Sequence, residues 1–248
     1  MAEILLKDGE RINQLFSTDV KIIQNREVFS YSVDSVLLSR FPNLPKRGLI
    51  VDLCAGNGAV GLFASTRTQA QIIAVEIQER LADMAQRSIE LNNLTSQMQV
   101  IQDDLKYLTR YISGSKVDMI LCNPPYFKVD EHSNLNASRH YLLARHEIAT
   151  NLEEICQISQ RVLKSNGRLT MVHRPERLLD IIETMTVHNL APKRIQFVYP
   201  KANRKANMLL IEAIKDGSRD GLKILPPLFI HNEDGSYTPE IHEIYYGN

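Results

Sequence analysis

Asn123-Pro124-Pro125-Tyr126 combines the residue types needed to bind a planar NH2 group. The side-chain oxygen of Asn123 and the backbone carbonyl of Pro124 are two acceptors that can take both hydrogens of such an amine. Two consecutive prolines stiffen the chain and keep these acceptors aimed, and the Tyr126 ring offers a face for stacking a flat substrate. The motif directly follows an apolar stretch, 117–122, which we expect to be a buried strand. A proline-stiffened turn without chemistry is the alternative interpretation.

A glycine-rich loop upstream provides a candidate cofactor site. Residues 51–61 have the sequence VDLCAGNGAVG, in which the last six residues match G-x-G-x-x-G. Glycines such as Gly56 and Gly58 let the backbone approach a ligand closely. Glu76 ends the next expected strand, about where a ribose-binding acid would lie. Taken alone, the loop fits either a nicotinamide enzyme or a methyltransferase.

The charge of Asp52 separates these two interpretations. A carboxylate just before the glycine turn would repel a pyrophosphate, whereas it would attract the ammonium and sulfonium groups of S-adenosylmethionine. Glu76 can accept hydrogen bonds from both ribose hydroxyls, and Asp103 or Asp104 can accept one from the adenine amine. Carboxylates that only cap helices or face water are the alternative. We therefore predict S-adenosylmethionine as the cofactor, bound by Asp52, Gly56, Gly58, Glu76, Asp103 or Asp104, and Asn123.

The elements that must position these residues follow a repeating pattern. Between about residues 49 and 214, β-rich runs alternate with helical patterns, which is typical of a parallel sheet covered by helices on both faces. The sequence therefore predicts an α/β, Rossmann-like sheet of seven strands. The expected strands lie near 49–54, 71–76, 98–102, 117–122, 167–172, 194–199 and 207–214. The expected helices lie near 59–67, 78–92, 105–112, 151–164 and 175–188.

Two shorter parts flank this core, which we place at residues 45–215. Residues 1–44 are expected to form a small cap, with a strand of alternating apolar and polar residues, a turn at 25–26, and a short helix that begins at Asp34. Residues 216–248 are expected to form a C-terminal extension of turns with a final strand or two, packed on the core.

The charge balance places any nucleic-acid contact in local clusters. Lys plus Arg and Asp plus Glu are each 29, so the chain has no global field that would attract RNA. Candidate RNA contacts are Arg139 and Arg145 after the proline motif, and Lys201, Arg204 and Lys205 before the last core strand. Either cluster could be only a solvated face.

The remaining reactive residue types give weak patterns. Cys54, Cys122 and Cys156 are odd in number and widely spaced, which favours reduced thiols in a cytoplasm. The histidines lack ligand spacing, so we predict no metal, and His146 is expected to be a paired surface residue. No apolar run approaches the length of a membrane span, and the N-terminus lacks the apolar core of a signal peptide. These features predict a soluble, cytoplasmic protein.

The order of these motifs resembles the class I S-adenosylmethionine-dependent methyltransferases that modify planar nitrogens. The resemblance covers residues 49–214 and includes a D-x-x-x-G-x-G loop, the acid Glu76 and N-P-P-Y. A closer resemblance, to the bacterial tRNA1(Val) adenine-N6 methyltransferases, rests on SVDSVLL at 32–38, ARHE at 144–147 and RKANMLLIE at 204–212. It implies an enzyme that methylates the adenine next to the anticodon of a valine tRNA.

The expected mechanism follows from the poor nucleophilicity of an aromatic amine. Two acceptors on its hydrogens would draw the nitrogen toward a tetrahedral shape and turn its lone pair to the sulfonium methyl. Asn123 and Pro124 are thus positioners, and no general base or nucleophile is assigned. Tyr126, helped by Phe127, would stack the base after it leaves its neighbours.

The sequence is also compatible with other substrates as acceptors of the methyl group. A protein glutamine has a planar amide that the same clamp could hold, but such enzymes carry a larger helical domain before the donor loop. Methylation of a guanine in ribosomal RNA is a further alternative, as is a non-catalytic RNA-binding protein with the same fold. The sequence leaves the oligomeric state open.

Overall fold

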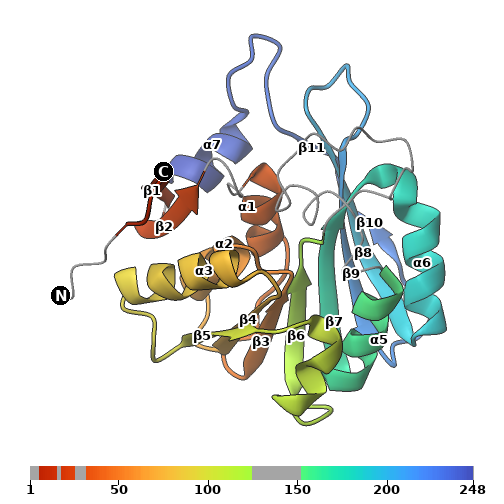
Figure 1. Cartoon of the computed structure of the whole chain (residues 1–248). Coiled ribbons are helices and arrows are strands. Elements are labelled where there is room, and N and C mark those ends of the chain that lie inside the picture. Colours follow the sequence, from red (N-terminus) through yellow and green to blue (C-terminus); the bar gives the residue numbers. More distant parts are fainter. Residues whose placement is uncertain (1–5, 16–17, 26–31, 125–151, 248) are drawn as a thin grey trace, which may run out of the picture.

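The computed structural model describes residues 6–15, 18–25, 32–124 and 152–247. These residues form an α/β fold in which one central sheet is covered by helices on both faces (Figure 1). The predicted α/β class is therefore confirmed. No helix in these ranges is long and apolar enough to span a membrane.

The central sheet contains the seven expected strands and two short additional ones among the described residues. Its strand order is β10-β8-β9-β7-β6-β3-β4-β5, and β11 also pairs with β8. Neighbouring strands are parallel except at β9, which is antiparallel to both β7 and β8. The strands are β3 (Leu49–Leu53), β4 (Gln71–Glu76), β5 (Met98–Gln102), β6 (Val117–Cys122), β7 (Leu163–His173), β8 (Leu190–Tyr199), β9 (Met208–Lys215), β10 (Lys223–Ile224) and β11 (Leu228–Phe229).

Helices cover the two faces because the strand side chains alternate between them. In β3, Ile50 packs in the apolar cluster with α1 (Val33–Arg40) and α2 (Ala59–Ser65). Val51 and Leu53 pack on the other face, in the cluster with α5 (Leu152–Val162) and α6 (Leu178–Val187). All three are fully buried, as expected for a central parallel strand. The helices are α1 (Val33–Arg40), α2 (Ala59–Ser65), α3 (Glu79–Leu91), α5 (Leu152–Val162) and α6 (Leu178–Val187), with 3-10 turns η1 (Leu105–Arg110) and η2 (Pro175–Arg177).

In the N-terminal part of the chain, the described residues form a hairpin and a helix. β2 (Val20–Asn25) pairs with β1 (Glu10–Leu15), which precedes it, so this hairpin is closed before β2. The turn predicted at 25–26 extends outside the described residues. Only Lys21 of β2 is exposed, because this strand contacts both α2 and α3. The helix α1 begins at Val33, one residue earlier than predicted.

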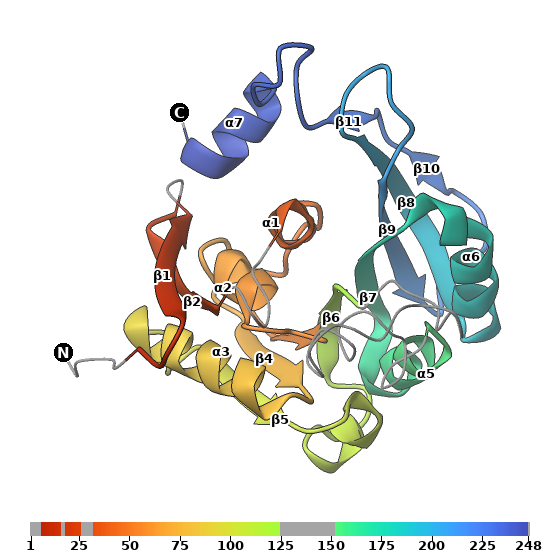
Figure 2. The ribbon, with the colours of Figure 1, turned by 45° about the horizontal axis from the view of Figure 1, so that its top comes forward.

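The C-terminal extension ends in a helix, α7 (Pro239–Tyr246), where only turns and strands were predicted. The residues at its start are typical of a helix N-terminus. The Thr238 hydroxyl accepts a hydrogen bond from the Ile241 amide, and Pro239 occupies the first turn. Ile241 is fully buried in the cluster that also contains α1 and α2. Figure 2 shows α7, the hairpin and α1 on the same side of the sheet, so the cap and the extension pack against one core.

Candidate active site

The glycine loop, Glu76 and Asn123 lie at the same edge of the sheet. β3 pairs in parallel with β4 on one side and β6 on the other, so that Leu53 is level with both Val75 and Cys122. Because carboxyl ends of parallel strands meet at one edge, the residues that follow these three strands converge there. The fold thus brings the predicted donor loop next to the start of the proline motif.

The Glu76 carboxylate is built into the glycine loop. It is 5% exposed, and its Oε2 accepts a hydrogen bond from the Gly56 amide at 2.8 Å while Oε1 accepts one from the Gln78 amide at 2.9 Å. Burial raises the pKa of Glu76, and these backbone hydrogen bonds oppose that rise. A third backbone hydrogen bond, from Ile77, also reaches this carboxylate. Because a carboxylate has about four acceptor positions, Glu76 retains acceptor capacity for a hydroxyl group of a ligand. Gly56 and Gly58 adopt left-handed φ angles of 58° and 82°, which favour glycine.

Asp52 lies fully buried at the end of β3. Its Oδ2 accepts a hydrogen bond from the Gly61 amide at 2.9 Å, whereas Oδ1 has no hydrogen-bond partner among the described residues. Burial raises the pKa of Asp52 to about 7, the Gly61 hydrogen bond lowers it, and the neighbouring charge of Glu76 raises it. A half-satisfied buried carboxylate has a strong preference for a cation or a donor.

Two further buried polar residues, one in the glycine loop and one in β2, were not predicted from the sequence. Asn57 is fully buried, and its Nδ2 donates to the backbone carbonyl of Ile23 in β2 at 3.0 Å. Its Oδ1 has no partner in the described part of the chain, and neither has Nε2 of Gln24, which is 2% exposed. Asn57 lies inside the G-x-G-x-x-G pattern, so its place at the cofactor site could have been predicted from the sequence. Gln24 carries no such pattern.

These unpaired atoms provide a test of the predicted cofactor. Asp52 Oδ1 and Asn57 Oδ1 are acceptors, whereas Gln24 Nε2 is a donor. An unpaired buried polar group costs about 1–3 kcal/mol, so native proteins keep few of them. The amino-acid end of S-adenosylmethionine offers an ammonium for the acceptors and a carboxylate for the donor. The residues present therefore fit this group.

Asp103 and Asp104 follow β5, one strand beyond Glu76. The Asp103 carboxylate accepts hydrogen bonds from the Tyr111 hydroxyl and the Asp104 amide, each at 2.8 Å. The Tyr111 hydroxyl is the main cause that lowers the pKa of Asp103. Asp104 instead caps η1, where its side chain accepts from the Lys106 amide at 3.0 Å and pairs with the Lys106 ammonium at 2.7 Å. Asp104 thus has a structural task, and Asp103 is the better candidate for the adenine amine.

Asn123 lies half-buried directly after β6, and Pro124 is buried beside it. The Asn123 Nδ2 donates to the hydroxyl of Ser35 in α1 at 3.3 Å. This contact was not predicted, although Ser35 lies inside the SVDSVLL motif. Predicted residues that lie outside the described residues are Pro125, Tyr126, Phe127, Arg139, Arg145 and His146.

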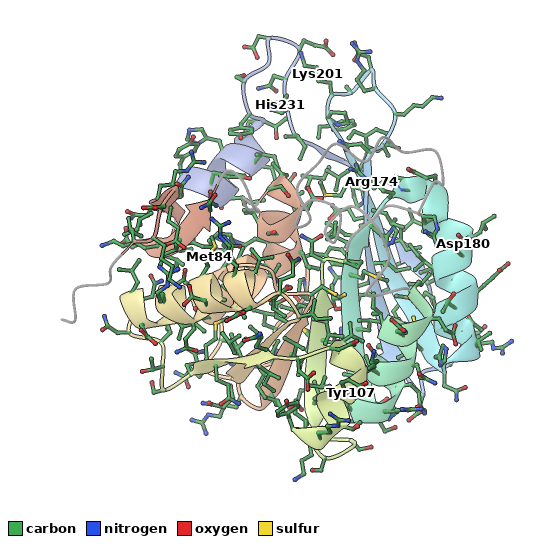
Figure 3. All side chains as sticks on the ribbon, viewed as in Figure 1. Met84, Tyr107, Arg174, Asp180, Lys201 and His231 are labelled. Atoms are coloured by element: carbon green, nitrogen blue, oxygen red, sulfur yellow. The ribbon has the colours of Figure 1, made fainter. Side chains whose placement is uncertain are left out.

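The basic cluster of Lys201, Arg204 and Lys205 lies between β8 and β9, at the same sheet edge as Asn123. β8 is three strands from β6, which corresponds to about 14 Å. Arg204 and Lys205 are exposed, but the Lys201 ammonium donates to the Glu233 carbonyl of the C-terminal extension at 2.9 Å. Figure 3 shows Lys201 at the end of the molecule where this extension lies.

Thiol and metal chemistry find little support in the described part of the chain. Cys122 and Cys156 are buried, and Cys54 is half-buried. Burial raises the pKa of Cys156 to about 12 and also raises that of Cys122, so both thiols stay protonated. Within the described ranges no three metal-binding side chains gather, and the absence of a metal stays a prediction. A groove of about 380 Å³ along α6 and residues 216–222 lies at the opposite end of the sheet.

The sheet order, the glycine loop and the two acids at the ends of β3 and β4 define a class I methyltransferase fold. The Methyltransferase small domain family matches residues 19–188, and the chain belongs to this family. It is an S-adenosylmethionine-dependent methyltransferase, and S-adenosylmethionine is its cofactor.

Known proteins resemble the chain in sequence and in structure. The tRNA1(Val) (adenine(37)-N6)-methyltransferase of Shewanella sp. strain MR-7 is 26% identical over 214 residues, which cover 86% of this chain and 89% of that protein. A predicted O-methyltransferase from Agrobacterium tumefaciens has a TM-score of 0.68 at 24% identity, over 87% of this chain and 96% of that one. A geranyl diphosphate C-methyltransferase from Streptomyces coelicolor, solved with S-adenosyl-L-homocysteine, has a TM-score of 0.53 at 12% identity, over 71% and 76% of the two chains. These two structures share the fold.

Proposed function

We propose that this enzyme methylates the exocyclic N6 amine of an adenine in tRNA, and that the target is the adenine next to the anticodon of a valine tRNA. The observation that carries the proposal is the position of Asn123, directly after β6 and one strand from the donor loop. Asn123 opens the N-P-P-Y motif, whose residue types suit a planar amine. The Shewanella relative is named for this reaction.

The donor-binding residues have distinct tasks in this proposal. Asp52 and Asn57 would accept from the ammonium of S-adenosylmethionine, and Gln24 would donate to its carboxylate. Glu76 would accept from the ribose hydroxyls and Asp103 from the adenine amine. When bound, the cofactor supplies an electrophilic methyl group on a sulfonium.

Asn123 and Pro124 would prepare the acceptor amine. Asn123 Oδ1 and the Pro124 carbonyl accept its two hydrogens, which draws the nitrogen toward a tetrahedral shape and frees the lone pair. The amine becomes cationic once it carries the methyl group, so its proton is acidic and leaves to solvent without a strong base. Tyr126 and Phe127 would stack the base, and Arg139 and Arg145 would contact RNA, as the sequence predicts.

A single-turnover assay of Asn123→Ala tests the clamp. With saturating valine tRNA and donor, we expect the methylation rate to fall on the order of a hundredfold, because one preorganised hydrogen bond in the transition state is lost. Affinity for S-adenosylmethionine, measured by calorimetry, should stay close to wild type. Asn43→Ala, at an exposed position before β3, is the matched control and should keep the rate. A near wild-type rate in Asn123→Ala would refute the clamp.

Mass spectrometry of nucleosides tests the substrate. We expect N6-methyladenosine in tRNA incubated with the protein and donor, and none without the protein. A methylated guanosine in ribosomal RNA, or a methylated glutamine in a protein fraction without any tRNA product, would overturn the assignment of adenine. No transfer to any fraction would favour the non-catalytic alternative.

A further inference from the structure

We propose that Ser35, in the N-terminal cap, is a positioning residue that holds the Asn123 carboxamide in place for methyl transfer. This inference rests on the proposed function of Asn123. Ser35 is 2% exposed, and its hydroxyl oxygen accepts a hydrogen bond from the Asn123 Nδ2 at 3.3 Å. The two residues are 88 positions apart in the chain, so the contact is made by the tertiary fold.

The orientation of this carboxamide decides whether Asn123 can hold an amine. The two ends of a carboxamide are nearly equal in size, but one is an acceptor and the other is a donor. Only the oxygen can accept from the NH2 group of a base. In the flipped orientation an NH2 group would face another NH2 group, and the clamp would lose an acceptor. In the structure the Ser35 hydroxyl accepts from Nδ2, and this hydrogen bond holds the carboxamide with its oxygen at the end away from Ser35.

The helix that carries Ser35 is held firmly against the core. α1 contacts α2, β6 and β7, and Val36, Leu37 and Leu38 are buried. The guanidinium of Arg67 donates to the Ser39 carbonyl at 2.6 Å, which fixes the end of the helix. A side chain whose helix is locked by packing can hold a reacting group within the narrow geometry that catalysis needs. A cap that only shielded the core would not need a polar contact at this point.

Ser35→Ala tests the inference, with Ser39→Ala as the matched control. Ser39 lies one turn further along α1, is fully buried, and donates to the Val36 carbonyl of its own helix at 2.7 Å. In single turnover with saturating tRNA and donor, we expect Ser35→Ala to lower the rate about five- to tenfold, as for one lost hydrogen bond that acts through its neighbour. The affinity for S-adenosylmethionine should not change. Ser39→Ala should alter neither quantity.

A double-mutant cycle separates positioning from a general effect on folding. In the background of Asn123→Ala, the further change Ser35→Ala should leave the rate unchanged, because no carboxamide is left to orient. Ser35→Cys keeps the side-chain volume but offers a weak acceptor, so it should resemble Ser35→Ala in rate and the wild type in its thermal unfolding.

The outcomes distinguish the two proposals. If Asn123→Ala loses the rate while Ser35→Ala and Ser35→Cys keep it, the role of Ser35 is refuted and the amine clamp stands. If Ser35→Ala slows the reaction equally in both backgrounds, Ser35 does not act through Asn123 and the inference is also refuted. A wild-type rate in Asn123→Ala would instead overturn the proposed function.

Discussion

Asp52 should destabilise the protein in the absence of its ligand, and this cost should depend on pH. Burial raises the pKa of Asp52 from 3.8 to about 7. A group whose pKa is raised by folding binds its proton more tightly in the folded state. The contribution of Asp52 to the free energy of unfolding therefore falls as the pH rises from about 4 to 7. Each pKa unit corresponds to 1.36 kcal/mol, so the full cost above pH 7 is about 4 kcal/mol.

Asp52→Asn removes this cost and keeps an acceptor for the Gly61 amide. Without donor, we expect the variant to exceed the wild type in free energy of unfolding by about 0.6 kcal/mol at pH 4 and about 4 kcal/mol at pH 8. Urea unfolding at several pH values measures this difference. Asp220→Asn, at an exposed position, is the control and should show no such trend.

The same substitution should weaken donor binding. Loss of a charged hydrogen bond costs about 1.5–3 kcal/mol, so calorimetry should show at least a tenfold weaker affinity of Asp52→Asn for S-adenosylmethionine at pH 8. With a pKa near 7, the wild type should itself bind about tenfold more weakly at pH 6 than at pH 8, whereas the variant should not. If the stability difference between the variant and the wild type does not change with pH, and the donor affinity is also unchanged, Asp52 is not a buried carboxylate that binds the donor.

Two further predictions concern RNA binding and the N-terminal hairpin. If Arg204 and Lys205 contact phosphates, replacing both with Ala should make the slope of log tRNA affinity against log salt shallower by nearly two units, and equal slopes would remove this loop from the RNA site. Arg87→Ala should lower the free energy of unfolding, measured in urea, by about 3 kcal/mol. Arg87 forms a 2.7 Å ion pair with Glu10, and the substitution would leave the Glu10 carboxylate, which is only 1% exposed, without its charge partner. Arg80→Ala, on the same helix, should cost much less.

The core could be predicted from the sequence because each of its strands carries its own pattern. Runs such as 119–122 are apolar on both faces of the strand, which is what a strand buried between two helical layers requires. The cap was harder, because β2 lies outside the central sheet yet is buried by α2 and α3. Its mixture of polar and apolar residues resembles a half-exposed strand. Burial by other elements overrode the local pattern.

The part of the candidate donor site that lies at the ends of successive core strands could be predicted from the sequence. Asp52 and Glu76 follow from their places at the ends of successive strands, and both lie at the glycine loop as expected. Gln24 and Ser35 belong to the cap, and no spacing rule relates them to residues that lie far along the chain, such as Asn123, which contacts Ser35. Their roles depend on tertiary contacts.

In the function proposed here, the N-terminal cap contributes to the chemistry of the enzyme as well as to its fold. The carbonyl of Ile23 holds Asn57 inside the glycine loop, and Ser35 holds the amide of Asn123 at the next strand but one from Glu76. A loop that binds a donor and a residue that binds an acceptor must keep a fixed separation for the methyl group to be transferred in line. The cap contacts both the glycine loop and Asn123, so it can fix the distance between them. The parallel sheet alone cannot do this, because its strands end before the loop and before Asn123.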